Sequence, residues 1–401
     1  MKKEYYAFIL VLILNFSDLQ LQAETTYYIP THYGGLFYGQ PTNARATAMG
    51  LTTITLGGIE NVIYNPASIG LEQQKLNTYF NYAVGNQVQV GSSYRYFGAS
   101  YRVNDKLVLG FSRFRWVEKD SPWTTIIGGY EESTDKSSQV MHSISGAYEV
   151  IPDLQLGLSG NFLTDRAVND IKTNSSFILS LGAIYDIDVD WIKLENLKNQ
   201  KFRVAGSFTN LLLKNRIEQR YEDYLNYRDL PIQLTLGTSY QGTLPFNPAF
   251  LSKGNGFFSN APKVVDLSLN LQFQEVLKGP EETVVNTNYK ENTALGIGGE
   301  ALFMKLLALR LGYYFEKRPK GFQEDGDFWV TKNKTGLTFG YGVKIPLNEL
   351  TDKKVPFDVD VDIVTFRVLN ELNTENYTHR PVFTDSKFLF SFGLKLKWII
   401  D

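Results

Sequence analysis

The sequence predicts an all-β protein: an antiparallel transmembrane β-barrel of about 14 strands with an N-terminal hatch inside its lumen. Three observations predict it. The chain begins with an export signal, its body alternates apolar and polar residues, and short connections alternate with long ones. We therefore expect the cell outer membrane of a Gram-negative-type cell as its location, with both termini in the periplasm.

The export signal is predicted over residues 1–23. Lys2 and Lys3 form a charged start, residues 5–16 are apolar apart from Asn15, and Ala23 offers a small residue for cleavage. A spanning helix needs about 20 apolar residues, so this run favours a signal peptide over a membrane anchor.

Residues 24–74 are predicted to form the hatch, or plug, because they are rich in Gly, Thr, Ala and Asn and show little alternation. Glycines permit tight turns in a narrow lumen, and an asparagine before proline is biased to extended backbone while its side chain bonds nearby backbone. The candidate hatch and gating residues are Gly50, Gly57, Gly58, Asn65, Pro66 and Ala67. A movable plug and a static plug are both compatible with this composition.

The barrel is predicted over residues 75–401 from two-residue periodicity. In 265–273 and in 307–315 the odd positions are apolar, and the even positions include Asn270 and Arg310. The predicted strands are 75–84, 92–103, 107–118, 138–150, 155–165, 174–186, 201–210, 231–241, 264–274, 293–303, 306–316, 334–346, 355–369 and 386–398. Alternation is blurred over 92–116. Their lengths suit tilted strands that cross a bilayer.

The connections give an independent signal. Tight turns at 103–106, 151–153 and 304–305 are each followed, one strand later, by a longer connection, as in outer-membrane barrels. Two connections, 187–200 and 242–263, are long where short ones are expected. A soluble sandwich or propeller would show the same strand periodicity, so that alternative stays open at this point.

A lumenal charge ladder is predicted near the C-terminus. Its members are Lys344, Asp358, Asp360, Asp362, Lys395 and Lys397. The aspartates alternate with apolar residues, so they should face the lumen. A hairpin at 370–385 places Asp358 opposite Lys397 and Asp360 opposite Lys395, and the turn at 347–354 brings Asp358 near Lys344. The ladder could lock the last strands, seat the hatch, or bind a polar headgroup.

Arg113 and Arg115 lie on one face of the predicted strand 107–118, with Phe111 and Trp116 nearby. Two guanidinium groups beside an aromatic wall could hold the carboxylate of a ligand. The alternatives are pairing with acidic residues in the lumen and a girdle at the membrane interface.

Other classes of function are disfavoured. The net charge of −2 argues against nucleic acid as a partner, and the absence of cysteine excludes thiolate metal sites. No nucleophile elbow, phosphate loop or zinc spacing occurs, so we expect no enzyme, no cofactor and no metal.

The segment 43–50, Asn-Ala-Arg-Ala-Thr-Ala-Met-Gly, is followed by Gly57-Gly58 and by Ile-Tyr-Asn-Pro-Ala-Ser-Ile-Gly at 63–70. It resembles the N-terminal signature of FadL-type outer-membrane transporters, the channels for long-chain fatty acids and hydrocarbons. The later stretches 202–210, 309–313 and 334–342 are closer to the PorV/PorQ branch of that superfamily. The chain departs from such barrels at its C-terminus, which ends in Asp401 rather than on an aromatic residue.

The resemblance implies a fourteen-stranded barrel with an inward-folded hatch, and passive uptake of small hydrophobic molecules such as long-chain fatty acids. The PorV-like branch implies the alternative, a barrel component of a type IX protein secretion system that binds exported proteins. The expected partners are outer-membrane lipid, a hydrophobic small molecule or an exported protein, and the general barrel-insertion machinery that assembles it.

Overall fold

The structure is a computed structural model. The residues that it describes are 42–87, 90–118, 138–166, 175–189, 196–211, 216–221, 224–229, 232–246, 262–278, 293–317, 334–351, 354–370 and 386–399. The predicted signal peptide, 1–23, and the start of the predicted hatch, 24–41, lie outside these residues.

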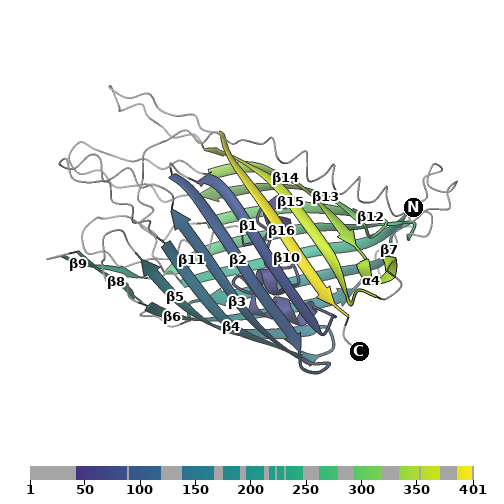
Figure 1. Cartoon of the computed structure of the whole chain (residues 1–401), viewed down its shortest axis with the longest axis horizontal. Coiled ribbons are helices and arrows are strands. Elements are labelled where there is room, and N and C mark those ends of the chain that lie inside the picture. The colour runs from purple at the N-terminus through teal and green to yellow at the C-terminus, as the bar shows by residue number, and fades with distance from the viewer. Residues whose placement is uncertain are drawn as a thin grey trace.

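Fourteen described strands form one closed antiparallel barrel, as predicted (Figure 1). The strands are β1 Leu76–Gln87, β2 Val90–Arg102, β3 Leu107–Glu118, β4 Ser138–Ile151, β5 Leu154–Arg166, β6 Ser175–Asp188, β7 Lys198–Thr209, β10 Ile232–Pro245, β11 Val264–Lys278, β12 Thr293–Phe303, β13 Leu307–Lys317, β14 Lys334–Ile345, β15 Phe357–Asn370 and β16 Ser386–Trp398. The first strand closes the barrel against the last, with Leu76 opposite Trp398. Closure leaves no sheet edge with unpaired backbone groups, which lipid would not satisfy.

Each predicted strand overlaps one barrel strand, and 107–118, 293–303 and 386–398 match the observed bounds. The short turn predicted at 304–305 is present but one residue longer, since β12 ends at 303 and β13 begins at 307. Met304 and Lys305 within it have φ of 53° and 57°, in the left-handed region. A separate two-stranded sheet, β8 Arg216–Tyr221 and β9 Tyr224–Asp229, was not predicted. The connection expected at 187–200 is shorter, since β6 continues to residue 188 and β7 begins at residue 198.

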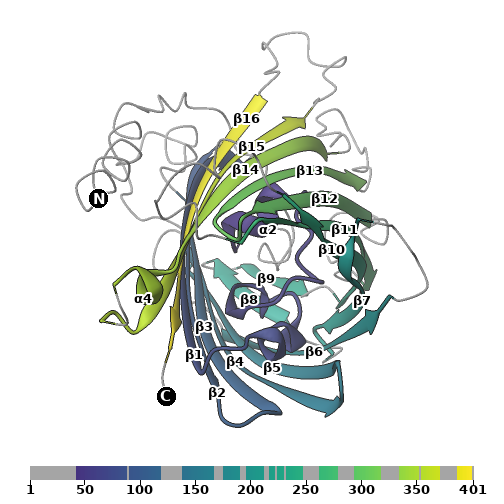
Figure 2. The same ribbon diagram turned by 90° about the vertical axis from the view of Figure 1, so that its right-hand side faces the viewer.

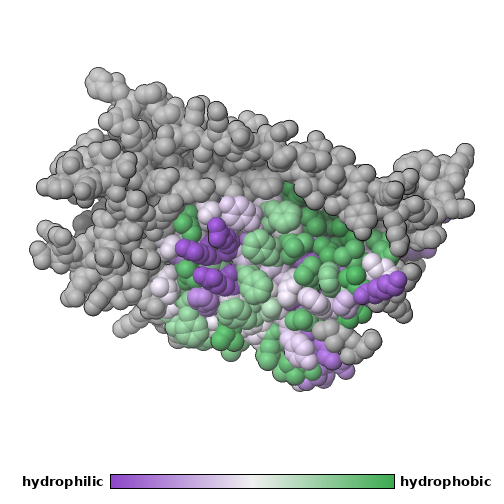
Figure 3. All heavy atoms as spheres, in the orientation of Figure 1, coloured by the Kyte–Doolittle hydropathy of each residue, from purple (hydrophilic) through white to green (hydrophobic). Residues whose placement is uncertain are grey.

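The two faces of the barrel wall differ as the periodicity predicts. Leu269 and Leu271 on β11 are 57% and 51% exposed on the outside, whereas Asn270 between them is buried. On β13, Leu311 is 60% exposed and the neighbouring Arg310 is buried. Figure 3 shows hydrophobic side chains over much of the visible outer wall. In the described residues these apolar faces do not pack on a second sheet, which argues against the sandwich alternative.

The connections fall at two ends of the barrel. The start of β1, the end of β16 and the turn at 304–306 lie at one end, which also holds the short helix α4 Leu347–Leu350. The connections 119–137, 318–333 and 371–385 join strands at the opposite end. We call these the short-turn end and the long-loop end. That the short-turn end faces the periplasm stays a prediction. Among the described residues, no helix has the length and apolar character needed to cross a membrane.

Candidate functional site: the lumenal segment and its seat

Residues 42–74, here called the lumenal segment, lie inside the barrel (Figure 2). The segment contains helix α2 Ala44–Ala48 and two short 3-10 helices, η2 Ile59–Asn61 and η3 Pro66–Leu71. Most of its residues are buried. It overlaps the predicted hatch, residues 24–74. That it serves as a hatch, and that it moves or gates, stays a prediction.

Two asparagines shape the segment locally. Asn43 caps α2, since its side chain accepts a hydrogen bond of 2.6 Å from the Ala46 amide, and its Nδ2 donates to Asn61 Oδ1 at 2.7 Å. Asn65 Oδ1 accepts from the Ala67 amide at 3.0 Å, directly before Pro66 at the start of η3. Asn65 therefore bonds local backbone as predicted, and its Nδ2 also reaches the Ile54 carbonyl at 3.0 Å.

Two of the three predicted turn glycines have positive φ: Gly50 at 67° and Gly58 at 121°. Gly57 does not; the space for its missing side chain is limited by Leu71 instead. The positive φ is consistent with a tight turn at Gly50 and Gly58, and the hatch role of all three glycines stays a prediction.

Glycines on the barrel wall form part of the seat, by which we mean the inner-wall residues that contact the lumenal segment. A β-carbon at Gly298 on β12 would overlap the Met49 carbonyl, and one at Gly312 on β13 would overlap the Gly50 amide. Across the lumen, a β-carbon at Gly157 on β5 would overlap the Ala67 amide. The backbone of the lumenal segment thus lies directly against the wall at these places, which only glycine allows.

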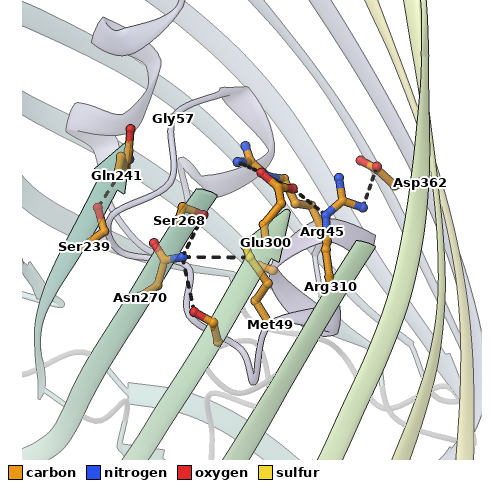
Figure 4. A network of polar contacts seen from close by, with 12 residues as sticks. Arg45, Met49, Gly57, Ser239, Gln241, Ser268, Asn270, Glu300, Arg310 and Asp362 are labelled. Atoms are coloured by element: carbon orange, nitrogen blue, oxygen red, sulfur yellow. Dashed lines mark hydrogen bonds and ion pairs between the residues drawn. The ribbon is translucent and has the colours of Figure 1, made fainter. Parts of the chain in front are cut away.

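A buried ion network fastens α2 to the wall (Figure 4). Arg45 contacts Glu300 on β12 through two nitrogens, at 2.6 and 3.0 Å. Glu300 also pairs with Arg310 on β13 at 2.6 Å, and Arg310 pairs with Asp362 on β15 at 2.7 Å. Arg310 and Glu300 are almost completely buried. Alternating positive and negative groups compensate one another in this enclosed place.

A second group of charges holds the middle of the segment. Lys395 on β16 contacts Glu60 at 3.0 Å and Glu72 at 2.9 Å. Burial raises the pKa of the Glu60 carboxyl above its ordinary value; Lys395 opposes this rise, and Glu72 adds to it. Hydrogen bonds between uncharged groups also hold the segment, because Gln272 Oε1 on β11 accepts from the Thr53 and Ile54 amides at 2.7 and 2.9 Å.

The predicted charge ladder is partly reproduced. Asp358 lies opposite Lys397 and Asp360 opposite Lys395, as expected. Lys344 lies directly opposite Asp360, so Asp358 is its diagonal neighbour, two residues along β15. The turn after β14 holds α4.

The side chains also pair differently from the backbone register. Lys397 forms its ion pair with Asp360, and Lys395 turns to the lumenal segment. Asp362 pairs with Arg310, and Asp358 accepts from the Asn348 amide at 3.1 Å. These contacts favour the roles of a strand lock and a seat over a headgroup site.

Arg113 and Arg115 do not face the lumen. Their neighbours Ser112 and Phe114 are fully buried on the inner side, and Arg113 shares the outer side with exposed Phe111. Trp116 is on the inner side, packed against the core. The structure therefore does not bring a ligand carboxylate from the lumen to these arginines, and it favours the interface-girdle alternative.

The sequence reasoning did not identify Arg45, Glu60, Glu300 and Arg310 as parts of the site. One signal was present in the sequence: Glu300 and Arg310 both occupy polar, inward positions of strands joined by a short turn. The observed turn, 304–306, sets them directly opposite each other. The contacts of Arg45 and Glu60 depend on the path of the lumenal segment, which periodicity does not give.

An apolar inner wall completes the site. The inward side chains of β2 to β6 include large apolar groups that belong to one buried cluster with the lumenal segment: Tyr94, Tyr96, Phe114, Met141, Leu163 and Ile178. The Tyr79, Tyr96, Phe114 and Tyr94 rings follow one another at centroid separations of 6.0 to 6.5 Å. Tyr96 donates its hydroxyl hydrogen to the Ile59 carbonyl of the lumenal segment. Barrel interiors are usually polar, so this wall is an unusual feature.

No protein-family model and no curated protein matches the sequence. Among solved structures, the chain is similar to the Pseudomonas putida toluene transporter TodX, with 12% identity, a TM-score of 0.47, and coverage of 94% of this chain and 100% of that one. It is similar to a Pseudomonas aeruginosa FadL homologue, with 12% identity, a TM-score of 0.49, and coverage of 94% and 100%. It is also similar to the CymD monoaromatic hydrocarbon channel, with 9% identity, a TM-score of 0.43, and coverage of 88% and 95%.

Proposed function

We propose that the protein is an outer-membrane barrel for passive uptake of small hydrophobic molecules, with long-chain fatty acids as the first class to test. The observation that carries the proposal is the apolar inner wall of β2 to β6, which joins the lumenal segment in one buried cluster. An apolar wall does not favour the passage of hydrophilic solutes, whereas the free energy of an apolar solute falls when it moves from water to such a wall. The resemblance of 43–70 to FadL-type transporters agrees with this role.

In the proposed pathway, an apolar molecule enters from the long-loop end and moves along the aromatic side chains toward η2. The lumenal segment then blocks its way, so release requires part of that segment to shift. Asn65, Pro66 and Ala67 are the proposed pivot, because η3 starts there and the Gly157 contact holds it close to β5. The outward apolar belt supports the proposed location in a membrane.

The test is uptake of a labelled fatty acid by cells that carry the gene and by cells that lack it. In the variant Met141→Gln an apolar group of the wall becomes polar, and we expect uptake to fall about tenfold, the change that 1.4 kcal/mol produces. The matched control is Ser143→Ala, which alters the next inward position of β4, where the hydroxyl makes no hydrogen bond to any described residue. Rates are normalised to the amount of assembled barrel.

Unchanged uptake on loss of the gene would overturn the proposal. If surface-protein secretion fails while uptake stays normal, the PorV-like role in a type IX system is the better description. The similar structures named above are described as transporters or channels, and no contact in the described residues favours the secretion role.

A further inference from the structure

The outer wall carries a basic cluster that the proposed transport does not use. Its members are Arg95 on β2 and Arg113 and Arg115 on β3. Arg95 and Arg113 are exposed, and inward neighbours on both strands, such as Tyr96 and Ser112, are buried. The three guanidinium groups therefore lie on the outer face. Figure 3 shows hydrophilic side chains gathered over this part of the wall, bordered by hydrophobic ones.

The register brings the three arginines together. Arg95 lies directly opposite Arg115, and Arg113 is two residues from Arg115 on the same face. His142 on β4 lies opposite Arg113. Like charges directly opposite each other on one face repel. None of the three arginines forms an ion pair within the described part of the chain, and Arg115 Nε is buried without a hydrogen-bond partner. Within the described residues, then, no anion compensates the cluster.

The position of the cluster along the wall indicates where that anion would come from. Arg115 is three residues from the end of β3 at the long-loop end, and exposed Leu109 and Phe111 lie on the side of the short turns. An arginine at the bilayer midplane costs about 2–4 kcal/mol, but one near the interface costs about 0–1 kcal/mol. We infer that the arginines lie at the border of the apolar belt nearest the long-loop end, where lipid headgroups are expected.

An aromatic ring lies beside one of the three arginines. The Arg95 guanidinium lies 5.7 Å from the centre of the Tyr82 ring. Stacking on a ring face leaves the N–H edge of a guanidinium free to donate. The fork of such donors matches the oxygens of a phosphate group.

We propose that Arg95, Arg113 and Arg115 form a binding site for the phosphate of a membrane lipid in the leaflet at the long-loop end. The site rests on the barrel lying in a membrane, which is part of the proposed function. It does not depend on uptake, because the three side chains face away from the lumen. A transport defect and a lipid-binding defect are therefore separate outcomes.

The experiment titrates the purified barrel in detergent with phosphate-bearing lipid A and counts bound lipid by native mass spectrometry. We expect R95Q/R113Q/R115Q to bind at least about tenfold more weakly than the wild type. The matched control K106Q/K263Q/K305Q removes three exposed charges at the short-turn end and should bind like the wild type. Fatty-acid uptake should be the same in both variants.

Two further arms identify the ligand. Dephosphorylated lipid A should bind as weakly to the wild type as lipid A binds to the arginine variant, and inorganic phosphate should not displace the lipid. Equal binding by wild type and R95Q/R113Q/R115Q, equal loss in the lysine control, or displacement by inorganic phosphate would each overturn the proposal. If the glutamine variant does not assemble, R95K/R113K/R115K is used instead, because it keeps the positive charges but lacks the forked N–H donors of guanidinium. Lipid A binding equal to that of the wild type would then overturn recognition by guanidinium.

Discussion

Arg310 is the residue on which the buried charges of the lumen depend most, since it contacts both Glu300 and Asp362. In Arg310→Met the Asp362 carboxylate loses its strong partner in an enclosed place. We expect the free energy of unfolding to fall by about 3–5 kcal/mol, the usual result of removing one member of a buried pair. Urea-induced unfolding in lipid vesicles measures it.

The control for this residue is Lys201→Met. Lys201 pairs with Asp188 at 3.7 Å, but both side chains are largely exposed, at 43% and 70%. An exposed pair contributes about 0–1 kcal/mol, so Lys201→Met should unfold nearly like the wild type. A loss of equal size in both variants would mean that burial of the Arg310 network does not matter.

At the scale of elements, the contact between β12 and the lumenal segment gives a second prediction. In Gly298→Ala the new β-carbon meets the Met49 carbonyl, a backbone group that has to move. We expect the barrel to assemble and the lumenal segment to leave its seat. Limited proteolysis between residues 42 and 74 should become faster, and ion conductance across planar bilayers should rise.

The neighbouring glycine supplies the control for this element. A β-carbon at Gly299 would meet only the Ser268 carbonyl at 3.6 Å, an ordinary contact. Gly299→Ala should therefore match the wild type in proteolysis and conductance. If Gly298→Ala also matches the wild type, the lumenal segment is not held by close backbone packing on β12.

The strands were predictable because lipid and lumen impose opposite demands on alternate residues, as in β11 and β13. The blurred stretch 92–116 has a physical reason. Phe97 and Phe111 face outward while Tyr94, Tyr96 and Phe114 face inward, so both sides are apolar where the inner wall is. That blurring hid the outward direction of Arg113 and Arg115. The contacts of Arg45 and Glu60 could not be predicted from the sequence, because they join segments that are distant in sequence. The two-residue periodicity of strands does not fix the positions of Arg45 and Glu60.

For the whole molecule, the decisive property is the apolar belt that faces outward. Leu311 lies in the middle of β13 and is 60% exposed, so in a membrane it contacts lipid tails. In Leu311→Arg a charge enters the belt near its centre. We expect a loss of about 2–4 kcal/mol in the free energy of unfolding from lipid vesicles.

The depth dependence of that loss separates a membrane barrel from a soluble one. Val103→Arg places the same charge in the turn between β2 and β3, at the short-turn end, where Val103 is 46% exposed. Because this turn lies near the interface, the expected loss is only about 0–1 kcal/mol. On the surface of a water-soluble barrel both positions would accept arginine equally well. Equal stability of the two variants would therefore contradict the membrane location, on which the uptake pathway and the lipid-phosphate site both depend.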